Sequence, residues 1–173
     1  MRSSTEPAHA LRGTAGRLTA IYHYPIKSCA GTALASATLT PRGLLHDREL
    51  LVIDPATGHF LTQREAPRLA LVRPAIADGE LTVAAVRQAA LTVPIAVDGP
   101  ARPVVVWRDT CLAVDQGDAI AAWLGAVIGR PCRLVRMAEH FVRHVDPHYA
   151  TSPRDQVGFA DGFPVLVISE ESL

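Results

Sequence analysis

Short apolar segments separated by turn residues make up most of this chain. Turn-forming runs at 41–43, 55–58, 78–79 and 98–100 divide segments that alternate between apolar and polar residues. Repeated short strands of this kind favour a barrel or sandwich over a βαβ array. We therefore predict a mainly β fold, a β-barrel of short, mostly antiparallel strands. The segments expected to be strands are 18–22, 33–40, 49–54, 59–62, 69–73, 80–84, 90–97, 104–107, 110–115, 132–137 and 165–168.

One segment, 118–128, has the periodicity of an amphipathic helix instead. Its apolar residues are three or four positions apart or adjacent, which places them on one face of a helix. They are Ile120, Trp123, Leu124, Val127 and Ile128. Asp118 is a suitable N-cap, and Gly129 is a natural residue to follow the last turn. The chain is therefore expected to contain one clear helix among its strands.

The composition limits the kinds of partner that this chain can have. Its 173 residues are 49% hydrophobic, which is enough for one domain with a substantial core. The 17 basic residues balance the 17 acidic ones, whereas nucleic-acid and membrane-surface binders carry a basic excess. No apolar run reaches the roughly 20 residues that span a bilayer. We expect no nucleic-acid partner and no membrane span.

The cysteines indicate a reducing compartment. Cys29, Cys111 and Cys132 are widely separated, and their odd number argues against a disulfide framework. The absence of a CxxC pair also argues against a structural zinc site. We therefore predict a cytoplasmic location.

Basic residues gather near the first predicted hairpin. Lys27 and Ser28 follow the first strand, where a lysine supplies charge and a serine supplies a hydrogen-bond donor for an anion. Arg48 and Arg64 flank the hairpin built around the turn at 55–58, so they should lie at the same end of it. These residues predict an anion site, and a rim of solvated cations is the alternative.

Three histidines four positions apart lie in the polar segment that precedes the last predicted strand. In a helix, His140, His144 and His148 would share one stripe and suggest a metal site. Pro147 and Pro153 make a continuous helix unfavourable, and no HExxH arrangement supports the site. We expect a solvated loop here and assign no metal ligand.

Six motifs occur in order along the chain. They are YPIKSC at 24–29, DR at 47–48 with VID at 52–54, TQR at 62–64 with PRL at 67–69, DQG at 115–117 with WL at 123–124, DQVGFAD at 155–161 and PVLVISEESL at 164–173. Together they resemble the N-terminal β-barrel domain of the MOSC family, named for the molybdenum-cofactor sulfurase C-terminal domain. The chain looks similar to the mitochondrial amidoxime-reducing components of that family and their bacterial counterparts.

The resemblance implies a molybdenum cofactor (molybdopterin) whose phosphate is held by Lys27, Ser28 and Arg48. It also places Asp161 in the stretch that lines the cofactor, and the hairpin argument adds Arg64. The implied enzyme is an oxidoreductase that acts on N-hydroxylated or related small molecules, with electrons from a redox partner protein. In the family the metal-ligating cysteine comes from the later MOSC core. No catalytic residue is therefore assigned.

Cys29 lies next to this predicted anion site, but we expect it to be an inert thiol. Adjacent residues at the end of a strand point in opposite directions, so a cysteine beside a phosphate-binding serine need not face the cofactor. A small, buried cysteine usually behaves as an apolar side chain. Cys29 is therefore not assigned as a ligand.

The resemblance also divides the chain into three expected parts. Residues 1–16 would be a flexible tail, residues 17–137 the MOSC N-terminal β-barrel domain, and residues 138–173 a linker with the truncated start of the MOSC core. The missing core would complete the cofactor site, so this fragment alone would be inactive. The apolar segment 165–168 would then be exposed and favour self-association.

Two further interpretations of the chain stay open. The barrel could be a non-catalytic binding module for an anionic small molecule, or a module that delivers cofactor or sulfur to a partner. The family's link to sulfur transfer includes partners that bind pyridoxal phosphate. Alternatively, the chain could be a structural domain without a ligand, in which the basic residues are a solvated rim.

Overall fold

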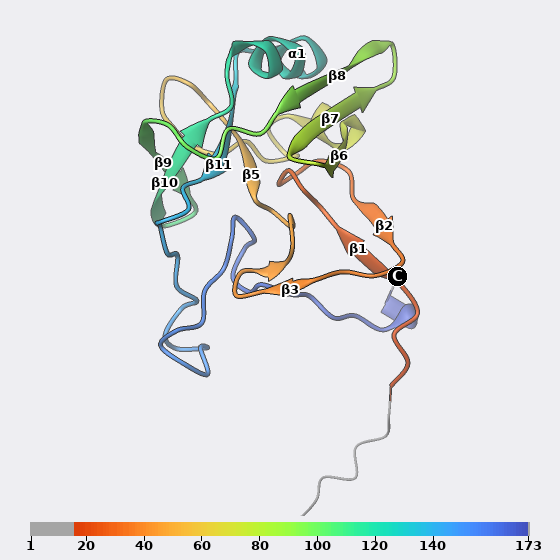
Figure 1. The fold of residues 1–173 in the computed structure, drawn as a ribbon, viewed down its shortest axis with the longest axis vertical. Helices are drawn as coiled ribbons and strands as arrows, with labels where there is room; N and C mark the ends of the chain where they lie inside the picture. Colours follow the sequence, from red (N-terminus) through yellow and green to blue (C-terminus); the bar gives the residue numbers. More distant parts are fainter. Residues whose placement is uncertain (1–15, 173) are drawn as a thin grey trace, which may run out of the picture.

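The computed structural model describes residues 16–172, which form a mainly β fold with one α-helix (Figure 1). The predicted fold class of antiparallel strands with a single clear helix is confirmed. The strands are β1 (Ile21–His23), β2 (Thr32–Leu34), β3 (Leu39–Thr40), β4 (Gly43–Leu44), β5 (Leu50–Ile53), β6 (Arg73–Ala77), β7 (Glu80–Ala85), β8 (Gln88–Pro94), β9 (Ala101–Val106), β10 (Asp109–Asp115) and β11 (Arg133–Met137). The helices are α1 (Asp118–Ile128) and the short 3₁₀ helices η1 (Pro67–Leu71) and η2 (Glu170–Ser172).

All strand pairs in the named sheets are antiparallel. A four-stranded sheet has the order β5-β11-β10-β9, and a three-stranded sheet has the order β6-β7-β8. Two small sheets consist of β1 with β2 and β3 with β4. Isolated parallel bridges join Ile26 to Leu50 and His59 to Val105. Within residues 16–172 these sheets and bridges do not close into one continuous ladder.

Strand β5 contributes to two hydrophobic cores, because successive side chains of a strand point to opposite faces. Leu50 and Val52 join a core that includes residues of β7, β11 and α1. Leu51 and Ile53 join a second core with residues of β9, β10 and β11. All four β5 side chains are fully buried. This explains why the segment is continuously apolar instead of alternating.

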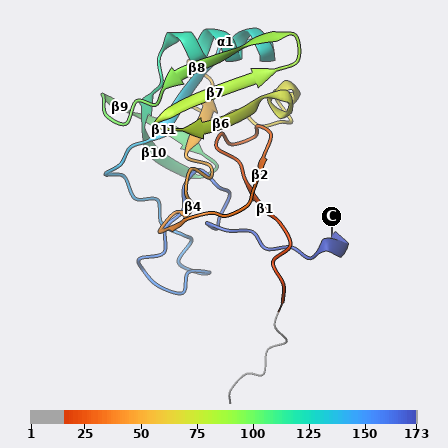
Figure 2. The same cartoon turned by 45° about the vertical axis from the view of Figure 1, so that its right-hand side comes forward.

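Helix α1 lies at one end of the molecule beside β8, and the C-terminal segment lies toward the other end in both views (Figures 1 and 2). The predicted bounds of the helix are those of the structure. The predicted N-cap is wrong by one residue: Gly117 occupies that position, and Asp118 belongs to the first helical turn. Gly129 ends the helix in a left-handed conformation with φ of 78°, as expected for a glycine after the last turn.

Four predicted strands differ in the structure. The predicted strand 59–62 does not form, because only His59 and Phe60 make isolated bridges, to Val105 and Ile53. The segment 33–40 is divided between β2 and β3, so it is not one strand. The predicted strand 69–73 is wrong except at Arg73. The 3₁₀ helix η1 takes its place, since Pro67 has the fixed φ that suits a first helical position, and β6 begins only at Arg73. Residues 165–168 are exposed as expected, but they form no strand, because no neighbouring strand of the described residues pairs with them.

The buried side chain of Leu134 in β11 provides a test of the first core. Leu134 is fully buried, so Leu134→Ala should lower the free energy of unfolding by about 2–5 kcal/mol, as large-to-small changes in cores do. Val86→Ala is the control, because Val86 is 79% exposed and should change stability by less than about 0.5 kcal/mol. Urea denaturation measures both values. Equal stability of the two variants would contradict this description of the core.

Candidate functional site: a basic cavity beside β5

The segment that follows β1 is held against the start of β5 by backbone hydrogen bonds. The Arg48 N–H donates to the Tyr24 carbonyl at 2.8 Å, and the Leu50 N–H donates to the Pro25 carbonyl at 3.0 Å. The Lys27 N–H donates to the Leu50 carbonyl at 2.9 Å. These bonds bring the predicted Lys27-Ser28 pair beside Arg48, although about 20 residues separate the two segments in the sequence.

All five predicted site residues line one cavity of about 380 Å³. They are Lys27, Ser28, Arg48, Arg64 and Asp161. The other lining residues are Tyr24, Cys29, Phe60, Thr62, Gln63 and Trp107. The structure therefore places together residues that come from four separate segments of the chain, and their binding role stays a prediction.

Lys27 is the most enclosed cation of this cavity. Only 8% of the residue is exposed, and its Nζ lies 2.6 Å from Oδ1 of Asp161 and 5.6 Å from the ring centre of Phe60. Burial lowers the pKa of the Lys27 ammonium below its ordinary value, and the hydrogen bond to Asp161 opposes that effect. The charged form of Lys27 is therefore stabilised by a nearby negative charge.

Asp161 supplies that negative charge from a much more open position. Burial acts to raise the pKa of its carboxyl group, but hydrogen bonds from Lys27 and Trp107 outweigh this, and the pKa lies below its ordinary value. The Trp107 indole N–H donates to the same Oδ1 at 2.8 Å. The Asp161 side chain is nevertheless 76% exposed.

Arg48 and Arg64 differ in how firmly they are held. The Arg48 guanidinium forms an ion pair with the neighbouring Asp47 and lies 4.6 Å from the ring centre of Tyr24. Asp47 in turn accepts the Tyr24 N–H at 2.7 Å. Arg64 is exposed, and within residues 16–172 it has no ion-pair partner. One guanidinium is therefore fixed in orientation, and the other is free to adapt to a ligand.

Backbone conformations that are unfavourable for side chains concentrate at this cavity. Six described residues other than glycine have positive φ, and three of them line the cavity. These are Ser28 at 69°, Arg48 at 46° and Trp107 at 55°. Such conformations cost free energy and are common at binding sites, where they aim side chains. The cavity is therefore a candidate functional site on backbone geometry as well as on charge.

Arg143 holds the segment that carries Asp161, and the sequence did not reveal it. Its buried guanidinium donates to the carbonyl oxygens of Gly158 at 3.0 Å, Ala160 at 2.6 Å and Asp161 at 3.1 Å. It also forms an ion pair with Asp109 at 2.7 Å. No local pattern marks Arg143, because all of these partners come from tertiary contacts. The aromatic walls Phe60 and Trp107 were missed for the same reason.

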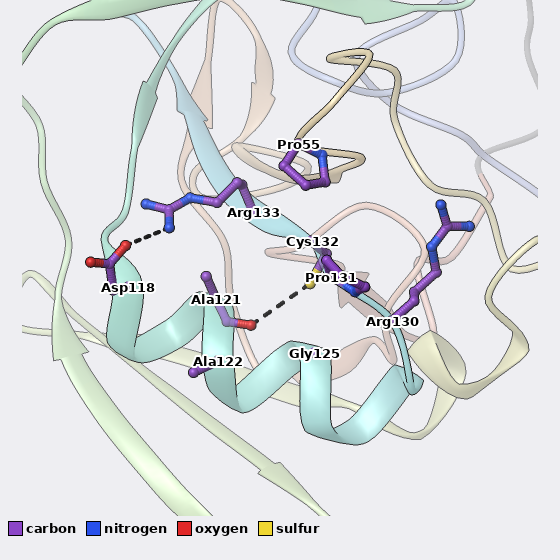
Figure 3. Close-up of a pocket in the computed structure, with 9 residues that line it drawn as sticks. All are labelled: Pro55, Asp118, Ala121, Ala122, Gly125, Arg130, Pro131, Cys132 and Arg133. Atoms are coloured by element: carbon purple, nitrogen blue, oxygen red, sulfur yellow. Dashed lines mark hydrogen bonds and ion pairs between the residues drawn. The ribbon is translucent and has the colours of Figure 1, made fainter.

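A second hollow of about 490 Å³ lies between α1 and the start of β11 (Figure 3). The Arg133 guanidinium is paired with Asp118 and Asp115, and Arg130 is paired with Asp54. The Cys132 thiol donates to the Ala121 carbonyl. Carboxylates neutralise both arginines, and no further cation lines this hollow, whereas the cavity beside β5 also has Arg64, which has no ion-pair partner among residues 16–172. The smaller cavity beside β5 is the better candidate.

Metal-binding groups are not assembled in the part of the chain that the structure describes. Residues 16–172 contain no cluster of three histidine, cysteine, aspartate or glutamate side chains suited to a metal. Cys29 lines the cavity but is 2% exposed, and burial strongly raises the pKa of its thiol. The rings of His148 and Tyr149 pack in a T-shaped arrangement. Among the described residues the cavity therefore presents no assembled set of metal ligands.

The family model described as the MOSC N-terminal beta barrel domain matches residues 15–131. The chain belongs to this family. This chain is 34% identical over 172 residues to the mitochondrial amidoxime-reducing component 1 of Mus musculus, covering 91% of this chain and 49% of that protein. It is 33% identical over 138 residues to the molybdenum cofactor sulfurase of Danio rerio, covering 76% of this chain and 16% of that protein.

A solved structure supports the same fold. The solution structure of a Bordetella bronchiseptica protein aligns with a TM-score of 0.53 at 26% identity, covering 67% of this chain and 87% of the other. This chain spans about half the length of the amidoxime-reducing relative and a much smaller share of the sulfurase. Within residues 16–172, none of the helices has the length and apolar character needed to cross a membrane.

Alkylation tests the character of the cysteines. Burial raises the pKa of Cys111 and Cys132 to about 11 and that of Cys29 further, so all three should be thiols at about pH 8. We expect iodoacetamide to leave the folded protein unmodified and to label all three after unfolding, as measured by mass spectrometry. Rapid labelling of Cys29 in the folded protein would show that it is accessible and reactive.

Removal of the Arg143 guanidinium should loosen the segment that carries Asp161. Arg143→Ala leaves buried carbonyl oxygens without a donor, so we expect a loss of about 3 kcal/mol in unfolding free energy. The amide of Phe159, which donates to the Arg48 carbonyl, should also exchange faster with deuterium. Arg154→Ala is the control, because Arg154 is exposed in the same part of the chain. Unchanged exchange at Phe159 would contradict the holding role.

Proposed function

We propose that this MOSC N-terminal domain binds the phosphate end of the molybdenum cofactor. The observation that carries the proposal is the enclosure of Lys27 in a cavity that two guanidiniums and a serine also line. A buried ammonium is costly unless an anion compensates it. Asp161 compensates Lys27 in this structure, and the relatives named for the molybdenum cofactor make its phosphate the leading candidate for a ligand anion.

The chemistry of each residue suits a phosphate monoester. Lys27 acts as a point charge, Arg48 and Arg64 can each donate two parallel hydrogen bonds, and Ser28 can donate its hydroxyl proton. Gln63 donates its side-chain N–H to the Ser28 carbonyl at 2.9 Å, which holds the loop that presents the serine. The set offers charge, directional donors and a fixed loop.

The remaining lining residues suit the ring system of such a cofactor better than its metal. Tyr24, Phe60 and Trp107 line the cavity, and aromatic faces pack well against flat rings. Phe60 and Trp107 pack edge to face with their ring centres 4.9 Å apart. The bound cofactor would supply oxidation and reduction at its metal, and the role of these residues is to bind and orient it. A metal ligand would have to come from outside the described residues.

The complete activity is proposed from the family resemblance. It is the reduction of N-hydroxylated or related substrates, with electrons from a redox partner protein. Two relatives carry the name amidoxime-reducing component, and this chain spans about half of their length.

The cytoplasmic location stays a prediction from the cysteine content, and the names of these relatives place those proteins in mitochondria. A partner that binds pyridoxal phosphate also stays a prediction.

The similarity to molybdenum cofactor sulfurases favours a second candidate, a module that binds the cofactor without turnover. Reduction of an N-hydroxylated probe by a cofactor-loaded protein that contains this domain together with a MOSC core, with dithionite as the electron source, distinguishes the two. Turnover supports the oxidoreductase. Cofactor binding without turnover supports the binding module.

Loss of two cavity cations tests the binding site directly. Lys27→Ala/Arg48→Ala should weaken the affinity for inorganic phosphate by at least about tenfold, since each charge-assisted hydrogen bond contributes about 1.5–3 kcal/mol. Calorimetry measures this affinity, and copurified pterin fluorescence measures retention of the cofactor. Arg73→Ala/Arg154→Ala is the matched control, because it removes the same charge from exposed positions outside the cavity. Equal phosphate affinity in both double variants would overturn the proposal.

A further inference from the structure

The ion pair between Lys27 and Asp161 occupies the position that a bound phosphate would need. The Lys27 Nζ lies 2.6 Å from the Asp161 Oδ1, and within residues 16–172 Asp161 is its one ion-pair partner. Both residues line the cavity together with Ser28 and Arg48. A phosphate that contacts the Lys27 ammonium must therefore compete with a carboxylate that is already there.

The two partners are held very differently. Lys27 is almost fully enclosed, while the Asp161 side chain is 76% exposed. The backbone on the Asp161 side is fixed, because the buried Arg143 donates to the carbonyl oxygens of Gly158, Ala160 and Asp161. Rotation of the Asp161 side chain into solvent would thus release Lys27 without movement of the backbone. It would break only the contacts of Asp161 with Lys27 and Trp107.

We infer that the Asp161 carboxylate is an internal substitute for the ligand anion, which occupies Lys27 in the free protein and rotates away when phosphate binds. This inference rests on the proposed function of the cavity as a phosphate site. Under this inference Asp161 does not bind the phosphate. Its negative charge repels the phosphate and competes with it for Lys27. The inference also explains how an enclosed ammonium is kept neutralised before the ligand arrives.

The arrangement has a measurable consequence for affinity. The apparent dissociation constant equals the intrinsic constant divided by the fraction of molecules in which Lys27 is free. If about one molecule in ten is in that state, the Asp161 carboxylate weakens phosphate binding about tenfold. Removal of the carboxylate charge should therefore tighten binding, whereas removal of a direct phosphate ligand would weaken it.

The first experiment compares Asp161→Asn with a variant of equal charge. Asp161→Asn should bind inorganic phosphate about tenfold more tightly than the wild-type protein in calorimetry. Glu80→Gln is the matched control, because it removes one negative charge from an exposed position in β7 outside the cavity. It should change the affinity much less. Lys27→Ala should abolish the binding in both backgrounds.

A second measurement needs no substitution. The chain has two tryptophans, whose indole N–H groups give separate NMR signals. The Trp107 indole donates to Asp161, and the Trp123 indole donates to the Ala89 carbonyl. Inorganic phosphate should shift the Trp107 signal, because its acceptor moves away. The Trp123 signal should remain in place and serves as the internal reference.

The outcomes separate this inference from the proposed function. Tighter phosphate binding by Asp161→Asn together with a shifted Trp107 signal supports both. Phosphate binding that requires Lys27, but that Asp161→Asn weakens or leaves unchanged, overturns the inference and leaves the phosphate site in place. Phosphate binding that leaves the Trp107 signal unshifted also overturns the inference and leaves the phosphate site in place. If no form of the protein binds phosphate, the proposed function is overturned and the inference falls with it.

Discussion

The burial of β5 on both faces is the constraint on which the rest of this structure depends. Its four side chains fill two cores, and its edges pair with β11 and with the segment that follows β1. Apolar burial is the dominant favourable contribution to folding, so this strand cannot shift its register without emptying both cores. The fixed position of β5 also fixes two residues of the cavity, because Arg48 lies just before this strand and the Lys27 N–H donates to the carbonyl of Leu50, the first residue of β5.

The charge balance of the cavity links distant parts of the chain. Lys27 and Asp161 are 134 residues apart in sequence, yet the ammonium of one is compensated by the carboxylate of the other. Arg143 fixes the backbone that carries Asp161, and Asp109 in turn compensates Arg143. A buried cation requires such compensation at each step, since an isolated charge in a protein interior is very costly. Under the inference drawn for Asp161, rotation of its exposed side chain would make Lys27 available to a ligand anion.

Several elements could be predicted from the sequence because local signals agreed with tertiary packing. The helix α1 has regular apolar spacing and a glycine after its last turn, and its bounds were predicted correctly. The predictions for 33–40 and 165–168 failed because alternation or apolar character does not make a strand without a neighbour to pair with. The predicted strand 69–73 failed up to Arg73 because Pro67 favours a helical turn there.

The sequence by itself determined the mainly β class, the position of the helix, the family resemblance and the cations that line the cavity. Only the tertiary structure decided that Asp161 faces Lys27, that Arg143 holds the 158–161 backbone and that Phe60 and Trp107 form the aromatic wall. The physical reason is the distance along the chain over which each kind of interaction acts. Turn residues and periodicity act over a few positions, whereas ion pairs and aromatic contacts form between segments whose meeting depends on how β5 is buried.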